Sequence, residues 1–186
     1  MTAALPPGLF SGIRIEAEND DDYERVTMYP HWDRVPDECF DVRNAVLAAE
    51  SVVPVTWLQT SPTKCKVTAG EWHDPYTGET FTDPADLDID HVVALKEAHN
   101  SGASEWTQER RREYANFMEN PDHLIAVKDS ENQSKSDKDP AAWVPPNEAY
   151  LCDYLRIWLN IKRDWDLSID EEEEVAIEEK SAACTS

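Results

Sequence analysis

The 186-residue sequence has few basic side chains and no long hydrophobic run. Its 17 lysines and arginines are outnumbered by 39 aspartates and glutamates, so the formal net charge is −22. A membrane-spanning helix needs roughly 18 or more consecutive apolar residues, so we expect no membrane partner. The scarcity of positive charge also disfavours long-range attraction to nucleic acid, because nucleic acid attracts basic proteins.

The sequence also lacks a CxxC pair, which argues against a zinc finger or a thioredoxin-like site. An even number of widely spaced cysteines favours two disulfides in an oxidising compartment, with buried thiols in a cytosolic protein as the alternative. The first ten residues lack the basic start and the apolar segment of a signal peptide. We therefore expect an extracellular protein whose signal peptide is absent from this chain. The four cysteines are Cys39, Cys65, Cys152 and Cys184.

Apolar side chains are nevertheless frequent enough to form a core. They make up 40% of the chain and include seven tryptophans, six tyrosines and four phenylalanines, which excludes a disordered acidic tail. We interpret residues 1–38 as an acidic N-terminal arm with one short strand. Residues 39–186 follow as a single domain, and we expect a monomer.

Helical and β-branched patterns are both present, which predicts an α+β fold. Asp41 is the expected N-cap of the first long helix. The predicted helices are 39–50, 104–118, 147–165 and 170–183, with a short helix or turn over 130–135. The predicted strands are 52–58, 64–68, 89–95 and 124–127, with turns over 83–86 and 96–102 and a hairpin over 71–82.

An Asp-His pair, Asp90-His91, lies inside the apolar segment Leu87–Val93. Burying both polar groups is costly unless they bind something. A second apolar strand, Leu124–Val127, follows later in the chain, and the polar segment Ser130–Lys135 comes directly after it. The order is therefore a strand with Asp-His, a second strand, and a short helix.

This order resembles the HNH, or His-Me finger, nucleases, whose ββα-metal core holds one divalent ion. Longer motifs resemble the secreted bacterial branch of that family, from about Cys39 to Cys184. The resemblance implies a ββα-metal core with added helices, and endonucleolytic cleavage that leaves 5′-phosphate and 3′-hydroxyl ends. The motifs are CFDVRN, CKVTAGEW, DPYTGE, LDIDHVVALKEAHNSGASEW, RREYANF, HLIAVKDSENQSKSDKDPAAWVPP and YLCDY.

Phosphodiester chemistry explains the residue types of this core. The charge of a phosphodiester repels a nucleophile, so a metal ion must neutralise it and a base must deprotonate water. Imidazole, with an ordinary pKa near ~6.5, is the natural base at neutral pH, and His91 takes that role. Asp90 and Asn132 supply the oxygen ligands of one Mg²⁺ or Mn²⁺ ion.

Three further residues are candidates for the catalytic site. His123, where many HNH nucleases have an asparagine, is expected to orient His91 or touch the metal, with a structural histidine as the alternative. Lys135 is expected to contact the phosphate, and Glu97 to support the site from behind. The residues expected to bind the nucleic-acid backbone are Arg110, Arg111, Lys128 and Lys135.

The substrate we expect is DNA, with RNA as an additional possibility. No recognition helix or base-reading motif is apparent, which predicts backbone recognition with little sequence preference. Of the three possible disulfide pairings we prefer Cys39–Cys65 with Cys152–Cys184, because each bond connects a terminal element to its neighbour. Three positions depart from the family pattern: Ala94 for Pro, Ser136 for Gly, and Phe117 for the Asp expected after Asn116.

Two non-catalytic alternatives remain open at this point. Asp86, Asp88, Asp90 and Glu97 occupy positions 1, 3, 5 and 12 of a calcium-binding loop. Two observations argue against a calcium-binding loop. His91 occupies the position where the loop needs glycine, and no helix is expected before the loop. The other alternative is an acidic decoy that mimics DNA, which only the net charge supports.

The negative charge is unevenly distributed along the chain. Residues 96–163 contain 10 basic and 12 acidic side chains, whereas the other 118 residues contain 7 and 27. The acid therefore lies mainly outside the segment expected to meet phosphates. We interpret the acidic remainder as a halophilic adaptation to high salt, where screening removes long-range repulsion. Affinity for nucleic acid must then come from the metal and a few local cations.

Overall fold

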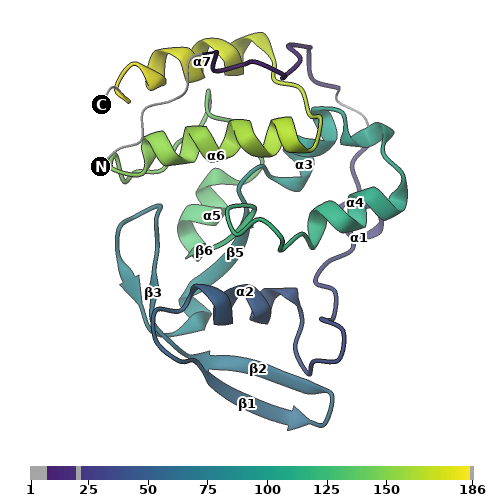
Figure 1. Cartoon of the computed structure of the whole chain (residues 1–186), viewed down its shortest axis with the longest axis vertical. Coiled ribbons are helices and arrows are strands. Elements are labelled where there is room, and N and C mark those ends of the chain that lie inside the picture. Colours follow the sequence, from purple (N-terminus) through teal and green to yellow (C-terminus); the bar gives the residue numbers. More distant parts are fainter. Residues whose placement is uncertain (1–7, 20–21, 185–186) are drawn as a thin grey trace.

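The predicted α+β fold class is confirmed in the computed structural model, which describes residues 8–19 and 22–184. These residues form seven α-helices and three two-stranded antiparallel sheets (Figure 1). The paired strands are β1 (Thr56–Ser61) with β2 (Lys64–Ala69), β3 (Trp72–His73) with β4 (Thr80–Phe81), and β5 (Leu87–His91) with β6 (Leu124–Lys128). The helices are α1 (Arg25–Met28), α2 (Val42–Glu50), α3 (Leu95–Asn100), α4 (Gln108–Ala115), α5 (Asp129–Lys135), α6 (Leu151–Asp164) and α7 (Glu171–Ser181).

The β5–β6 pair lies at the centre, with α2 on one side and α6 on the other (Figure 1). Leu124 and Ala126 pack in the cluster of α2, whereas Ile125 and Val127 pack in the cluster of α6. This separation follows from the period of two in a strand, which points successive side chains to opposite faces. Helix α5 follows β6 directly and contacts both strands.

Several element boundaries differ from the sequence prediction. The strand expected to begin at Ile89 and end at Leu95 begins at Leu87 and ends at His91. The turn expected over 96–102 is replaced by α3, because its Leu, Lys, Glu and Ala residues are strong helix formers. The helix expected from Ser104 begins only at Gln108, where the Thr107 side chain accepts a hydrogen bond from the Arg110 N–H. The capping role of Asp41 is confirmed, since it accepts from the Asn44 N–H at 3.0 Å.

The N-terminal arm is packed against the rest of the chain. Ile15 forms an isolated bridge with Ile169 in place of the expected short strand, and the Asn19 N–H donates to the Asn100 carbonyl at 2.9 Å. Tyr29 is fully buried. Residues 1–7, 20–21 and 185–186 of the predicted arm and domain lie outside the described residues.

Both predicted disulfides are confirmed. Cys39–Cys65 connects the loop before α2 to β2, and Cys152–Cys184 connects α6 to the segment after α7. Native disulfides of this kind typically stabilise a domain by about 2–4 kcal/mol. Within the part of the chain that the structure describes, no helix combines the length and the apolar character required to cross a membrane.

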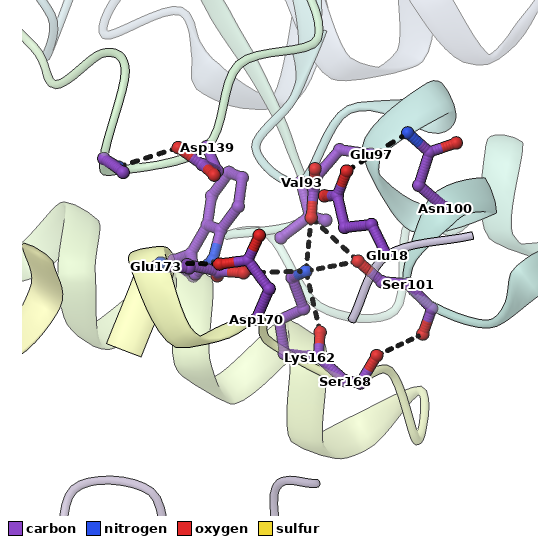
Figure 2. A network of polar contacts seen from close by, with 12 residues as sticks. Glu18, Val93, Glu97, Asn100, Ser101, Asp139, Lys162, Ser168, Asp170 and Glu173 are labelled. Atoms are coloured by element: carbon purple, nitrogen blue, oxygen red, sulfur yellow. Dashed lines mark hydrogen bonds and ion pairs between the residues drawn. The ribbon is translucent and has the colours of Figure 1, made fainter. Parts of the chain in front are cut away.

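A buried polar network joins three helices on the α6–α7 side (Figure 2). Lys162 of α6 has no exposed surface, and its ammonium group donates to the Glu97 carboxylate of α3. It also donates to Ser101 Oγ at 2.6 Å and forms an ion pair with Glu173 of α7 at 3.4 Å. A buried lysine is tolerable only with such partners, because an unpaired charge inside a protein is strongly destabilising.

The carboxyl groups of this network do not all ionise together. Burial, together with a hydrogen bond with Glu97, raises the pKa of Glu18 to about 8. Burial likewise raises the pKa of Glu173 to about 7, against the opposing effect of Lys162. For Glu97, burial raises the pKa, but Lys162 together with hydrogen bonds to Glu18 and Ser101 makes the net shift downward. Near neutral pH the network therefore holds Glu97 ionised beside Lys162, with protons shared by the other two acids.

We predict that the melting temperature falls as the pH rises from about 6.5 to about 8. Below about 6.5 the buried neutral His91 and His123 act in the opposite direction, because the unfolded chain protonates both histidines there. A carboxyl group whose pKa is raised by folding keeps a proton that the unfolded chain has already lost. Its stabilising contribution is complete below the unfolded pKa near 4.5 and disappears as the pH rises through the folded values of about 7 and 8. Calorimetry of Glu173→Gln should show a smaller fall, because the amide stays neutral at every pH. In the control Glu178→Gln, an exposed position on the same helix, the melting temperature should fall as much as in the wild type. A melting temperature that is constant or rises over this range would contradict the prediction.

Candidate active site

A cavity of about 470 Å³ opens between β5, the first residues of α3 and the second half of α5. It brings together the predicted site residues Asp90, His91 and Asn132. Asp88 of β5 also lines the cavity, as do Tyr23 and Arg25 of the N-terminal arm. One strand (β5), two helices (α3 and α5) and the arm therefore meet at this cavity.

The His91 ring is held in one tautomer. Its Nε2 lies 2.9 Å from the Ala115 carbonyl oxygen, and since a carbonyl only accepts, Nε2 carries the hydrogen. Nδ1 is therefore the nitrogen with a free lone pair. The Trp32 ring lies parallel to the imidazole at a centroid distance of 5.3 Å. Burial lowers the pKa of His91 well below its usual range, and His123 contributes in the same direction.

Asp90 is fixed by hydrogen bonds to both carboxylate oxygens. Lys135 of α5 donates to Oδ1 at 2.9 Å, and the Tyr76 hydroxyl donates to Oδ2 at 2.6 Å. Burial raises the pKa of Asp90, and Lys135 and Tyr76 oppose that rise. Lys135 has no exposed surface and also donates to the His91 carbonyl at 3.0 Å. The structure thus places Lys135 beneath Asp90 and not at the cavity surface.

A second pair joins the same strand to the same helix. Asn132 Nδ2 donates to Asp88 Oδ2 at 3.1 Å. The arrangement follows from the two periodicities, because Asp88 and Asp90 share one face of β5 and Asn132 and Lys135 share one face of α5. Asp88 was not among the predicted site residues, although its spacing of two from Asp90 in a strand is a signal for it.

The oxygen atoms at this cavity suit a hard cation. Asp88, Asp90 and Asn132 offer two carboxylates and one amide oxygen, and each carboxylate oxygen can accept more than one partner. Among the described residues, no group of three or more His, Cys, Asp or Glu side chains could hold a metal. A site with so few protein ligands fits Mg²⁺, which retains several waters, better than zinc.

The alternative calcium loop is not formed. Asp88 and Asp90 lie along the extended strand β5, whereas an EF-hand loop wraps its ligands around one ion. Glu97, expected to support the catalytic site, is 2% exposed and bonded to Lys162 (Figure 2). It is therefore placed in the α3–α6–α7 network and not in the wall of the cavity.

The arm contributes a positively charged group that sequence reasoning missed. The Arg25 guanidinium donates to His31 Nε2 at 3.3 Å, and His31 Nδ1 in turn donates to the Tyr29 carbonyl at 2.8 Å. No described carboxylate pairs with Arg25. Nothing near Arg25 in the sequence indicates this role, because only the fold brings it to the Asp-His strand.

Asn116 attaches the arm beside the site through two hydrogen bonds. Asn116 Nδ2 donates to the Pro30 carbonyl at 2.9 Å, and Asn116 Oδ1 accepts from the Asp33 N–H at 2.7 Å. Arg112 adds a bidentate pair with the Asp33 carboxylate. The end of α4 therefore has two roles. The Ala115 carbonyl orients His91, and the next residue, Asn116, holds the arm.

His123 lies behind His91, at a ring-centroid distance of 6.2 Å. Its Nε2 donates to the Tyr114 carbonyl at 2.8 Å, and burial lowers its pKa to about 4. It is not among the residues that line the cavity. Phe117, the departure from the expected Asp, packs against the His123 ring and against Trp165.

The cations expected to bind the nucleic-acid backbone make contacts within the protein. Arg110 lies over the Trp106 ring at 4.4 Å and donates to the Trp165 carbonyl. Arg111 donates to the Ser104 carbonyl at 3.1 Å. Lys128 forms an exposed ion pair with Glu79 at 3.0 Å. Their role in binding nucleic acid stays a prediction.

Comparison with known proteins adds two findings. The family model described as GmrSD restriction endonucleases, C-terminal domain, matches residues 43–180. A fungal protein from Arthroderma benhamiae, described as an uncharacterized secreted protein, is 37% identical over 183 residues, 98% of this chain and 86% of that protein. No solved structure matches the chain. The secreted relative and the two disulfides confirm the predicted extracellular location, whereas the expected bacterial branch is not confirmed.

We predict that Asn116→Ala loosens the arm beside His91. Loss of both hydrogen bonds should speed amide exchange of residues 30–33 and lower the free energy of unfolding by about 1–3 kcal/mol, as measured by hydrogen-exchange mass spectrometry and urea unfolding. Asn120→Ala is the control, because that side chain accepts only from the nearby Asp122 N–H. Unchanged exchange in Asn116→Ala would show that other contacts hold the arm.

Proposed function

This chain belongs to the family of GmrSD restriction endonuclease C-terminal domains, and from that premise we propose that it hydrolyses nucleic-acid phosphodiesters at the β5–α5 cavity. The family is a nuclease family, so the class of substrate is nucleic acid. The cavity contains the side-chain groups that such a reaction uses: a fixed imidazole, two carboxylates, an amide and an arginine. The non-catalytic alternatives explain none of these contacts.

The observation that carries the proposal is the hydrogen bond from His91 to the Ala115 carbonyl. A general base needs a free lone pair in a fixed direction and must be neutral before the reaction. The carbonyl fixes Nε2 as the donor, and burial keeps the ring neutral by lowering its pKa. His91 is therefore prepared to take a proton from water at Nδ1.

We assign the site to the HNH type, with a ββα-metal core formed by β5, β6 and α5 in that order. Asp90 and Asn132 would hold one Mg²⁺ or Mn²⁺ ion, with Asp88 beside them. When bound, such an ion neutralises phosphate charge and stabilises the leaving oxygen. Lys135 and Tyr76 orient the Asp90 carboxylate for this purpose.

Arg25 is the side chain we assign to the phosphate itself. Its guanidinium reaches the cavity without a described carboxylate partner, and His31 fixes its direction. Arginine recognises phosphate oxygens through paired N–H donors. Contacts of this kind read the backbone and not the bases, so we propose cleavage with little sequence preference. DNA is the substrate we propose, with RNA as the alternative.

We predict that His91→Ala lowers the rate of DNA cleavage by about two to four orders of magnitude, the usual contribution of a general base. Plasmid and single-stranded DNA should be incubated with Mg²⁺, and the melting temperature should be compared with that of the wild type. His73→Ala, an exposed histidine on β3, should cleave like the wild type. Equal rates for His91→Ala and the wild type would rule out this role for His91.

We also predict that EDTA abolishes cleavage and that added Mg²⁺ or Mn²⁺ restores it. Binding of Mn²⁺ can be followed without any substrate, by electron paramagnetic resonance. Asn132→Ala should weaken that binding, whereas Ser134→Ala, an exposed position on the same helix, should leave it unchanged. Undiminished cleavage in EDTA would contradict a metal-dependent reaction.

A further inference from the structure

The β1–β2 hairpin is unusual in charge for this protein. Residues 51–70 contain no aspartate or glutamate, although the whole chain contains 39. The same stretch contains Lys64 and Lys66. In Figure 1 the hairpin lies at the opposite end of the molecule from α7, whose first turn contains four glutamates.

A second cavity, of about 350 Å³, lies beside this hairpin. Arg34, Lys64 and Lys66 line it, and no described carboxylate forms an ion pair with any of the three. Arg34 is oriented by donating to the carbonyl oxygens of Thr63 and Glu38. Asp41 also lines the cavity, but its carboxylate caps α2. The cavity therefore presents three cations and one engaged carboxylate.

One residue contacts both the second cavity and the active-site histidine. Trp32 lines the second cavity and at the same time stacks on His91. A polymer bound at His91 that extends past Trp32 would reach the hairpin next.

Two contacts hold the hairpin in a fixed position against the loop before α2. The Cys39–Cys65 disulfide connects it to the loop before α2, and the Phe40 and Trp57 rings stack at 4.8 Å. Lys64 and Lys66 are exposed, while Val67 is buried in the α2 core. Two lysines spaced by two in a strand point to the same side.

We propose that Arg34, Lys64 and Lys66 form a second subsite that binds the nucleic-acid strand beyond the phosphate being cleaved. The inference rests on the proposed function, since it takes the scissile phosphate to lie at His91. Three cations in a protein of net charge −22 favour a polyanion over an apolar or acidic partner. Leu58 of β1 is exposed and lies opposite Lys66 in the hairpin, so it adds apolar surface beside the two lysines.

The test is a Lys64→Gln/Lys66→Gln double variant assayed on two substrates. For an oligonucleotide of about 20 nucleotides, we expect KM to rise about tenfold with little change in kcat. The slope of log KM against log salt should fall by about 1 for each lysine removed. Bis(p-nitrophenyl) phosphate is too small to reach the hairpin, so its hydrolysis should be unchanged.

The matched control is Arg14→Gln/Lys180→Gln, which removes the same charge near the two ends of α7 and should behave as the wild type. An oligonucleotide KM equal to that of the control overturns the inference, and so does an equal loss on both substrates. A binding measurement does not require catalysis. In it, His91→Ala protein, with and without the two lysines, is titrated into a fluorescein-labelled oligonucleotide. Weaker binding without the lysines supports the subsite even if the wild type cleaves nothing, whereas equal binding refutes it.

Discussion

The buried ion pair between Asp90 and Lys135 is the contact on which the rest of the site depends. Burial favours the neutral acid, and Lys135 is the charge that opposes it. Because Lys135 and Asn132 lie three residues apart on α5, the pair that fixes one also places the other beside Asp88. Removing one member of such a pair typically costs about 3–5 kcal/mol, because the remaining charge is left buried alone. Stability and the shape of the cavity are therefore coupled at this point.

The net charge of −22 disfavours a polyanionic substrate only if the charge is treated as uniform over the surface. Arg25 and Lys96 line the first cavity, and Arg34, Lys64 and Lys66 line the second. The acidic surface lies elsewhere, for example along the first turn of α7. Such a distribution provides short-range binding without long-range steering. The interpretation of the acidic remainder as an adaptation to high salt stays a prediction.

Local patterns in the sequence predicted much of this fold. The α+β class and the Asp41 cap are confirmed, because capping and hydrophobic period act over a few residues. Both disulfides are confirmed as well, although they join residues 26 and 32 positions apart. The grouping of Asp90 and Asn132 followed from the order strand, strand, helix. What escaped prediction depends on contacts between distant segments. The sequence around Glu97 does not indicate that it pairs with Lys162, which lies 65 residues later. Arg25 reaches the site only because the arm folds back.

The central claim is that the cavity between β5 and α5 hydrolyses phosphodiesters with His91 as the base. The most direct measurement is mass spectrometry of the products that the wild-type protein forms from a defined oligonucleotide with Mg²⁺ or Mn²⁺. The account predicts fragments with 5′-phosphate and 3′-hydroxyl ends, which the His91→Ala protein does not form. An oligonucleotide that stays intact with both metals, or fragments that end in 3′-phosphate, would contradict it.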